Sequence, residues 1–518
     1  MKSTEIELIR SMESPTEPLV LSEDERLLFA LGYKQELARR MSGFSNFAIS
    51  LSIICILAGG ITSFHVGWCS VGGASIGLGW PLACLFSLVV ALTMAQVASA
   101  FPTAGGLYHW SSILGGRGWG WVTAWFNLVG IVTALGAINA GTFDFAAAAF
   151  GIGGGEHAHL VKTVVVVAMT LSQGLLNHYG IRLTTRLTDL SGWLILLVSA
   201  VLTASLLAAV SHWDLARLVT FTNFSGLPQD SPVFPRQQNM MWLFALGLLL
   251  PAYTITGFDA SAHTSEETMD AARNVPRGIV RSVWVSGLFG WFMLCAIALA
   301  IPDTREAAAK GADVVHWVLK TTLPGWLAWS LLATIVSAQY FCGLAALTSA
   351  SRMAYAFARD GGLPCSAYLG KVSERTRTPC HAIWSSAVLA ALFTVLVPYT
   401  TIAAVCVIFL YISYVLPVLA GFFAWGRRWT RMGPWHLGKW YRPLAMISAL
   451  GCVFLILIGM QPPNQQAAWI VGVALVLMLA FWFAVEQKRF RGPPRTSLVL
   501  PTPPPEPALA WEAPTPKP

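Results

Sequence analysis

Charged residues are scarce in this chain of 518 residues. Asp, Glu, Lys and Arg together make up only 11% of it, whereas 55% of the residues are hydrophobic and the mean hydropathy is +0.61. A soluble protein of this length rarely has so few charges. The composition therefore argues against an ordinary soluble protein, and the net charge of +8 gives no basis for a nucleic-acid surface.

Motifs for catalysis or metal binding are also lacking. The sequence contains no H-E-x-x-H, no Walker loop and no plausible catalytic triad, and no charged or metal-binding cluster suggests a membrane enzyme. No C-x-x-C pair occurs among the nine cysteines, Cys55, Cys69, Cys84, Cys295, Cys342, Cys365, Cys380, Cys406 and Cys452. Most fall in apolar runs and are expected to pack as small apolar residues. We therefore predict no catalytic residue, no cofactor, no metal and no enzymatic activity.

Long apolar runs are what the chain does have. A bilayer-spanning helix needs about 20 apolar residues, and about twelve such runs are present, at 44–66, 80–100, 119–150, 160–177, 187–210, 240–263, 279–301, 325–350, 382–399, 401–425, 444–460 and 467–486. The first 40 residues show no apolar signal-peptide core. The sequence therefore predicts an all-α polytopic protein of the cell membrane, with the lipid bilayer as a partner.

The placement of basic residues predicts the orientation. If both termini are cytoplasmic, the inner segments collect most of the arginines, including Arg39, Arg40, Arg117, Arg182, Arg186, Arg273, Arg277, Arg281, Arg352, Arg359, Arg427, Arg428 and Arg431. The outer loops then keep only Lys162, Arg217, Arg236, Arg305, Lys310 and Lys320. Because cytoplasmic loops carry the excess of Lys and Arg, we predict that both termini are cytoplasmic.

Two apolar runs carry glycine interruptions in matching places. The first contains L-A-G-G-I-T-S-F at 57–64, and the sixth contains Y-T-I-T-G-F-D-A-S at 253–261. Paired interruptions in corresponding positions of two halves point to an inverted-repeat transporter with its site at mid-depth. A rival interpretation is close helix packing, for which glycine is common in membranes.

A broken membrane helix exposes backbone groups that a ligand can use. Freed amides at a helix start suit an anion, so we expect Gly60, Ile61 and Thr62 to face a substrate carboxylate. Carbonyls of Ile56, Tyr253 and Thr256 would accept hydrogen bonds from an ammonium group. The predicted substrate site therefore comprises Ile56, Ala58, Gly59, Gly60, Ile61, Thr62, Tyr253, Thr254, Thr256, Gly257 and Phe258.

Four stretches, at 31–50, 98–110, 256–268 and 351–364, carry a family resemblance. They read L-G-Y-K-Q-E-L-A-R-R-M-S-G-F-S-N-F-A-I-S, A-S-A-F-P-T-A-G-G-L-Y-H-W, T-G-F-D-A-S-A-H-T-S-E-E-T and S-R-M-A-Y-A-F-A-R-D-G-G-L-P. With them the chain resembles the amino acid–polyamine–organocation superfamily, most closely the amino acid/choline branch that includes γ-aminobutyrate permeases.

The resemblance implies a leucine-transporter-like core of five plus five inverted helices, followed by two more. We expect a cytoplasmic tail at 1–40, a core at 41–425 with repeats at about 41–210 and 240–425, helices eleven and twelve at 426–487, and a disordered Pro-rich tail at 488–518. The motif A-G-G at 58–60 replaces the usual G-S-G turn. Tyr253 falls where some relatives place an aromatic ring that stacks on the ligand and helps close the outer path.

Asp259 follows the sixth-run glycine directly. A carboxylate at this depth is costly and is a functional candidate by default, and in relatives an acid here is implicated in proton coupling or gating. We therefore predict coupling or gating for Asp259, with a static buried pair and direct recognition of a substrate amine as the alternatives. Asp144 lies nearer an interface and is a weaker candidate, and Gln96 is expected to hydrogen-bond at the inner end of its helix.

The resemblance also bears on the driving ion. Sodium-coupled proteins of this fold use hydroxyls in helix eight, and here Ala345 and Ala346 stand at those positions, with Thr348 and Ser349 nearby. Some proton-linked relatives place a lysine of helix five in the vacated sodium site. The corresponding run, 187–210, contains no lysine. We therefore predict sodium-independent transport, with protons as a possible coupling ion or with exchange.

Several alternatives stay open. The predicted function is secondary active transport of amino acids or compounds such as γ-aminobutyrate by alternating access. An organic-cation transporter for choline or polyamines and a non-transporting nutrient sensor are the rivals. A cluster of charges in the cytoplasmic segments, comprising Glu266, Glu267, Asp270, Arg273 and Arg277, is expected to form ion pairs. The oligomeric state is not predicted.

Overall fold

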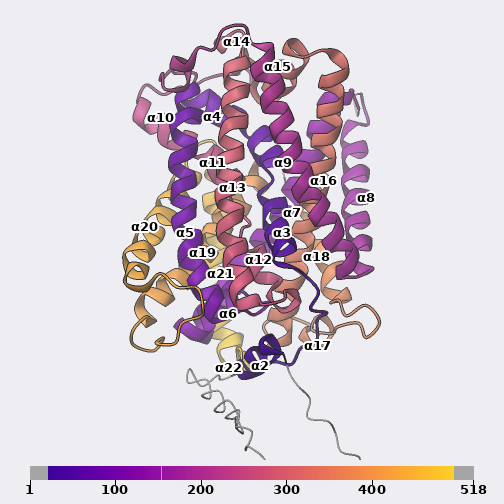
Figure 1. The fold of residues 1–518 in the computed structure, drawn as a ribbon, viewed down its shortest axis with the longest axis vertical. Coiled ribbons are helices and arrows are strands. Elements are labelled where there is room, and N and C mark those ends of the chain that lie inside the picture. The colour runs from indigo at the N-terminus through magenta and orange to yellow at the C-terminus, as the bar shows by residue number, and fades with distance from the viewer. Residues whose placement is uncertain (1–21, 153–154, 398, 495–518) are drawn as a thin grey trace, which may run out of the picture.

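The chain folds into a bundle of helices (Figure 1). The structure is a computed structural model that describes residues 22–152, 155–397 and 399–494. Within these ranges no strand occurs, and the only β-type pairings are isolated bridges between Met41 and Thr268 and between Trp425 and Trp429. The predicted all-α fold is confirmed.

Ten helices of the described chain are long and apolar enough to cross a membrane. They are α3 with η1 (Gly43–Ile54, Ile56–Gly60), η2 with α5 (Ser75–Gly79, Trp80–Ala100), α7 (Arg117–Phe150), α8 (Ala158–His178), α9 (Ile181–Ala209), α13 (Ala271–Ala300), α16 (Gly325–Arg359), α19 (Tyr399–Ala424), η6 with α20 (Gly438–Trp440, Tyr441–Gly459) and α21 with η7 and α22 (Gln465–Phe481, Trp482–Glu486, Gln487–Arg489). Two shorter apolar spans are α10 with α11 (Met240–Gly247, Leu249–Thr254) and α18 (Cys380–Leu396). These positions match the twelve predicted runs, so the protein is a polytopic membrane protein.

Short helices outside the spanning segments lie towards the two ends of the bundle. They are α2 (Glu23–Ala30), α4 (Phe64–Val71), α6 (Leu107–Gly115), α14 (Thr304–Lys310), α15 (Val314–Thr322) and α17 (Ser366–Leu369). Helix α12 (Ala260–His263), which falls within the predicted run at 240–263, is buried inside the bundle. Helices α14 and α15 lie at one end, whereas α2, α17 and α22 lie at the other, which we call the α2 end (Figure 1). Both ends of the described chain therefore lie on the same side of the bundle.

Side-chain caps set where the two helices that lead into the glycine interruptions begin. The Ser42 hydroxyl accepts a hydrogen bond of 3.1 Å from the Ser45 amide at the start of α3. The Asn239 side chain accepts one of 3.1 Å from the Trp242 amide at the start of α10. Ser and Asn are strong N-caps because their side chains satisfy amides that have no partner within the helix. The caps thus fix the register of both interrupted segments.

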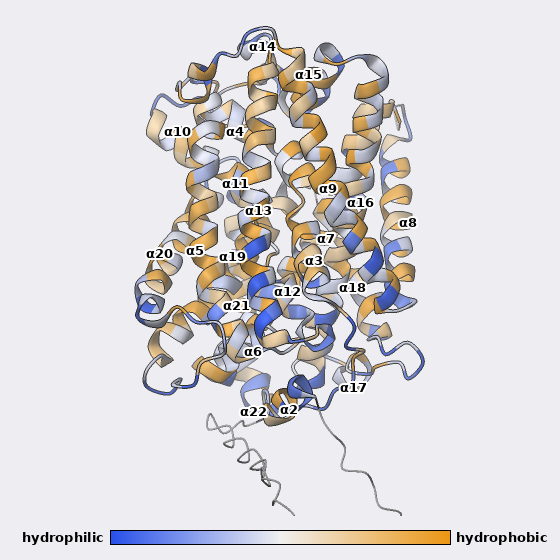
Figure 2. Cartoon of the chain, in the orientation of Figure 1, coloured by the Kyte–Doolittle hydropathy of each residue, from blue (hydrophilic) through white to orange (hydrophobic). Residues whose placement is uncertain are grey.

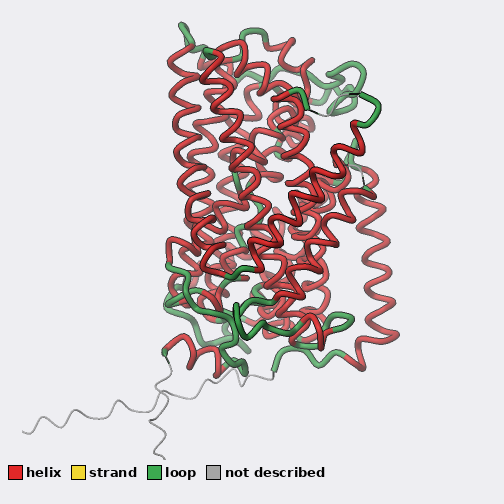
Figure 3. The backbone as a smooth tube through the Cα atoms, turned by 90° about the vertical axis from the view of Figure 1, so that its right-hand side faces the viewer, coloured by secondary structure: helices red, strands yellow, loops and turns green. Residues whose placement is uncertain are grey.

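Polarity is distributed as a membrane requires. Loops gather at the two ends of the bundle, and short non-helical stretches also lie inside it (Figure 3). Apolar residues cover most of the helices, while hydrophilic residues concentrate near the α2 end, around α12 (Figure 2). Helix α21 is peripheral, since Trp469 near its start is 78% exposed and its apolar stretch is almost wholly unburied. Such a face suits lipid or a protein partner.

Helix α3 lies among the other helices of the bundle, in contact with α9, α13 and α16. The chain before it, residues 22–40 of the predicted tail, also packs against the bundle, because the side chains of Leu28, Leu31 and Leu37 are buried. Most of the predicted C-terminal tail, residues 495–518, lies outside the described residues.

Candidate functional site

The first helix is interrupted earlier than the glycines predicted. Helix α3 ends at Ile54, and Cys55 adopts φ +21° and ψ +85° before the chain continues as the π-helical turn η1. Positive φ is rare for a residue with a side chain. The Cys55 carbonyl accepts hydrogen bonds from the amides of Ala58 and Gly59, at 2.7 Å and 3.0 Å. The break is therefore centred on Cys55 rather than on the Gly59–Gly60 pair.

The second interruption lies where the sequence predicted it. Helix α11 ends at Thr254, the chain is non-helical from Ile255 to Asp259, and α12 begins at Ala260. Gly257 has φ +82°, a conformation that a glycine adopts without strain. Its amide donates a hydrogen bond of 2.9 Å to the hydroxyl of Tyr414.

The two breaks lie against each other, since α11 packs on η1. A Cβ atom added to Gly59 would come within 2.9 Å of the Thr254 Cα, and one added to Gly257 would clash with the Ile53 Cγ2. Gly59 is thus required for close approach of the two backbones, and Gly257 makes room for the Ile53 side chain. Both roles agree with the interpretation that the glycines serve close packing. At Gly60 the added atom would meet only ordinary contacts of 3.7 Å and more.

A cavity of about 90 Å³ lies beside the two breaks. Residues of the two interrupted helices, α7, α16 and α19 line it. Among the predicted site residues it is lined by Ala58, Gly59, Thr62, Tyr253, Thr256 and Gly257. No charged side chain of the described chain is among the lining residues. The volume is below the roughly 300–1,000 Å³ of pockets for drug-sized ligands, so the cavity suits a small, overall neutral solute.

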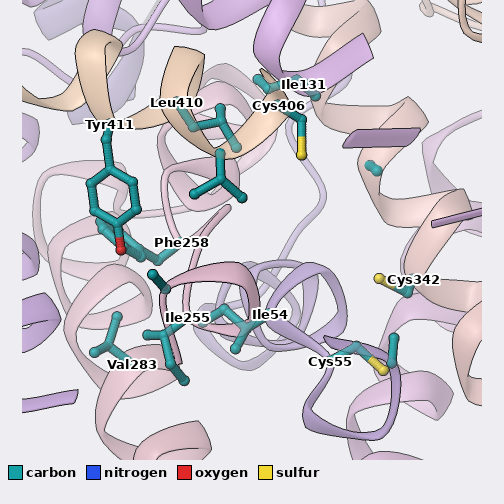
Figure 4. Close-up of a cluster of buried hydrophobic side chains, with 14 of the residues drawn as sticks. Ile54, Cys55, Ile131, Ile255, Phe258, Val283, Cys342, Cys406, Leu410 and Tyr411 are labelled. Atoms are coloured by element: carbon teal, nitrogen blue, oxygen red, sulfur yellow. The ribbon is translucent and has the colours of Figure 1, made fainter. Parts of the chain in front are cut away.

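The other predicted site residues do not line this cavity. They are Ile56, Gly60, Ile61, Thr254, Phe258 and Asp259. Gly60 faces Met293 and Leu294 of α13, and the Phe258 ring packs on Tyr414 with centroids 4.9 Å apart. Figure 4 shows Phe258 in one part of the apolar cluster and the sulfur atoms of Cys55 and Cys342 in another. These residues therefore pack against neighbouring helices and do not face the cavity.

Residues of α7, α16 and α19 that were not predicted as site residues also line the cavity. They include Gln339 and Cys342 of α16, Thr142 of α7, and Cys406 of α19. A polar residue in the middle of an apolar run, such as Gln339, is the one signal that the sequence offered. The others are small or apolar residues, which only the packing of the helices brings to the cavity.

Asp259 is buried in contact with three polar side chains. Its carboxylate accepts hydrogen bonds from the Tyr414 hydroxyl at 2.8 Å and from the Asn127 amide at 3.0 Å, and it contacts the His263 Nε2 at 3.2 Å. The same Tyr414 hydroxyl receives the Gly257 amide, so the carboxylate is linked to the second break through one side chain. Asp259 thus contacts the second break through Tyr414.

His263 is a further buried residue that the sequence analysis did not single out. Its Nδ1 lies 3.2 Å from the Ala104 carbonyl oxygen, and its Nε2 lies at the same distance from the Asp259 carboxylate. A carbonyl oxygen only accepts, so the first contact is a hydrogen bond when Nδ1 carries a proton. The second break and the Ala104 segment are therefore joined by a buried carboxylate and imidazole in direct contact.

The chain is similar in sequence to known membrane permeases over most of its length. The profile of the family described as amino acid permease matches residues 41–484. The chain belongs to the amino acid permease family. Amino-acid permease BAT1 of Arabidopsis thaliana is 32% identical over 92% of this chain and 97% of its own length. The GABA-specific permease of Saccharomyces cerevisiae is 28% identical over 92% and 86%, and a candidate polyamine transporter of Candida albicans is 26% identical over 92% and 90%.

The family membership confirms the predicted superfamily resemblance. It also confirms the predicted broad function, because the matched relatives are permeases: the protein is a membrane transporter for amino acids or related amines. The break, the cavity and the buried network described above thus belong to a permease.

At the α2 end of the permease, the predicted ion pairs form with partners from α16. Arg359 holds Glu266 at 2.8 Å, and Arg352 holds Glu267 at 2.9 Å. Burial alone would raise the pKa of the Glu266 carboxyl, but the charge and hydrogen bonds of Arg359 outweigh it and keep the pKa below its usual value. Glu266 is therefore ionised at neutral pH, and it also accepts from the Ala104 amide at 3.0 Å.

The other predicted polar contacts are more local. Arg273 pairs with Asp270 at 3.6 Å, whereas no ion pair of Arg277 is found in the described part of the permease. Asp144 pairs with Lys162 at 2.7 Å and both are partly exposed. Gln96 accepts a hydrogen bond of 2.8 Å from the Leu437 amide, as predicted.

The two alanines at the predicted sodium-ligand positions lie inside the bundle. Ala345 and Ala346 are buried. The Cys342 thiol, near them on α16, donates to the Ile53 carbonyl at 3.3 Å, and the Thr348 hydroxyl donates to Asn177 at 2.8 Å. A thiol is a poor ligand for a hard cation such as sodium.

Proposed function

We propose that this permease is a secondary active transporter of small amino acids or amino-acid-like compounds such as γ-aminobutyrate. The observation that carries the proposal is the uncharged cavity of about 90 Å³ between the two helix breaks. A zwitterion has no net charge, so it needs no charged side chain there if backbone dipoles meet its two ends. The yeast relative named a GABA-specific permease supports the same cargo class.

A polyamine or another organic cation fits the cavity less well. Such a cargo brings positive charge without a carboxylate and needs an anionic partner. The nearest candidate, the Asp259 carboxylate, does not line the cavity and already contacts three polar side chains. We therefore place direct recognition of an amine by Asp259 below its role in coupling.

We further propose that transport is coupled to protons through Asp259 and His263, by symport or by exchange, and is independent of sodium. The His263 imidazole, which would share the proton with Asp259, contacts the Ala104 carbonyl through its other ring nitrogen. The Ala104 amide in turn binds Glu266, which Arg359 ties to α16. Loss of the proton would leave the Nε2 lone pair facing a carboxylate, so it would loosen the link between the break and the α2 end.

The core is proposed to be two inverted five-helix repeats, at about 41–210 and 240–425, in the cell membrane with both termini cytoplasmic. The matching positions of the two breaks support the repeat, and the polar α2 end supports the orientation. The exposed thiol of Cys365 tests the orientation. In cells expressing a variant that keeps this cysteine alone, an impermeant maleimide should react only after permeabilisation. Labelling of intact cells would reverse the assignment.

Transport by purified protein in liposomes tests the function. Labelled γ-aminobutyrate would be offered with an imposed proton gradient and no sodium, and competed by α-amino acids, choline and polyamines. Saturable uptake inhibited by amino acids is the expected result. Inhibition by amines without a carboxylate, and not by amino acids, would indicate an organic-cation transporter. Binding of an amino acid without uptake or exchange would indicate a sensor.

A further inference from the structure

Gln339, which lines the cavity, carries a buried hydrogen-bond acceptor that no other group of the described chain uses. The residue lies in α16, is only 1% exposed and lines the cavity between the two breaks. Its Nε2 donates a hydrogen bond of 3.0 Å to the Leu57 carbonyl. Because a carbonyl oxygen only accepts, the side-chain NH₂ must face Leu57. The amide orientation is thereby fixed, and the Oε1 is left buried without a protein partner in the described chain.

Three other polar side chains that line the same cavity are bonded within the protein, whereas no side-chain hydrogen bond of Ser63 or Thr256 is found in the described chain. The Thr62 hydroxyl donates to the Ala58 carbonyl at 2.8 Å, and the Thr142 hydroxyl donates to the Ile138 carbonyl at 2.7 Å. The Tyr253 hydroxyl receives a hydrogen bond of 2.9 Å from Asn464. Buried acceptors without a partner are rare in native proteins and each calls for an explanation. A ligand that donates an N–H supplies one.

We propose that Gln339 Oε1 accepts a hydrogen bond from the ammonium N–H of the substrate, so that Gln339 selects primary amines over quaternary amines. The proposal rests on the proposed function, since it names the amine subsite of the same cavity. A quaternary ammonium group has the same charge but no N–H, and so it leaves the acceptor unpaired. Sites built to hydrogen-bond a substrate group reject analogues that lack it, because the buried partner then stays unsatisfied.

The position of Gln339 also says where the ammonium end of the substrate lies. Its side chain is tied to Leu57 in η1, so the ammonium group is placed at the junction of η1 and α16. Tyr253 and Thr256 of the second break line the same cavity. A bound amine would therefore touch the interrupted first helix and α16 together.

The test compares γ-aminobutyrate with its N-trimethyl analogue as competitors of labelled γ-aminobutyrate, in the wild type and in Gln339→Met. Methionine keeps the length of the side chain but removes the acceptor. We expect the substitution to weaken the apparent affinity for γ-aminobutyrate by about 10- to 100-fold, the range for a hydrogen bond to a charged group. The affinity for the analogue should stay within about threefold of its wild-type value. Steric exclusion of the larger analogue cancels in this comparison because it is present in both proteins.

Two further variants complete the design. Gln339→Leu also removes the acceptor and should reduce the preference for γ-aminobutyrate in the same way, which covers the case in which Gln339→Met fails to fold. Thr142→Val removes a polar group that the protein itself already binds, so it should not change the ratio of the two affinities. Ligand-induced thermal shifts of the purified proteins would accompany the uptake measurements.

An equal loss of affinity for both compounds in Gln339→Met would overturn the inference. It would indicate that the Oε1 binds a water molecule or serves only packing. A wild type whose uptake and melting temperature respond to no amino acid would overturn the proposed function and, with it, this inference. A responsive wild type in which Gln339→Met keeps the full preference would overturn the inference alone.

Discussion

The Arg352 guanidinium donates two hydrogen bonds of 2.9 Å to the Glu267 carboxylate, and neither side chain is exposed to solvent. The pair joins α16 to the segment that follows the second helix break. Its neighbour Glu266 is held by Arg359 in the same way. The segment beyond the break is therefore clamped to α16 at the α2 end.

Removing one partner of the Arg352–Glu267 pair should be strongly destabilising. Glu267→Gln leaves a buried guanidinium without its counter-charge, which costs about 3–5 kcal/mol. We expect a clearly lower melting temperature of the detergent-solubilised protein. Arg273→Gln is the matched control, because that residue and its partner Asp270 are each about half exposed and such pairs are worth about 0–1 kcal/mol. Equal effects of the two substitutions would contradict the clamp.

The adjacent glycines of the first break should differ in their tolerance of a methyl group. Gly59→Ala forces a Cβ against the Thr254 backbone and should cost about 1–3 kcal/mol, with loss of transport. Gly60→Ala meets only contacts of 3.7 Å or longer and should be close to neutral. Uptake and thermal stability of the two variants, measured side by side, check this. Greater damage from Gly60→Ala would show that the close approach at Gly59 is not what the break requires.

Asp259→Asn should uncouple transport from the proton gradient. The substitution keeps the size of the side chain but removes the charge that balances the proton shared with His263. We expect exchange of internal and external substrate to persist while accumulation driven by a pH gradient is lost, and His263→Gln to behave alike. Asp144→Asn, in a partly exposed pair with Lys162, should keep both activities. Full gradient-driven accumulation in Asp259→Asn would rule out coupling at this site.

Replacing sodium by N-methylglucamine, at constant pH and membrane potential, should leave uptake unchanged. Alanines stand at the two positions where relatives place hydroxyl ligands, and the Cys342 thiol fills the neighbouring contact with Ile53. Initial rates of uptake with and without sodium measure this directly. Uptake abolished by the replacement would show that oxygen ligands elsewhere, such as Thr348 or Ser349, form a sodium site.

One of the two helix breaks could be predicted from the local sequence and the other could not. Gly257 could be predicted as a break because glycine tolerates the positive φ that it adopts. Cys55 could not, since a positive φ at a cysteine is imposed by its surroundings. The Gly59–Gly60 pair was the visible signal, but Gly59 serves the contact with Thr254.

The class of protein, the number and order of the spanning helices and the family could all be predicted from the sequence. These properties follow from apolar length and motifs, which are local along the chain. Which residues share the cavity became visible only in the folded chain. Gln339 and Thr142 reach it from α16 and α7, while Phe258 and Asp259 turn away from it. Which side of a helix faces the cavity depends on contacts between helices distant in sequence, and no local pattern in an all-apolar run encodes that choice.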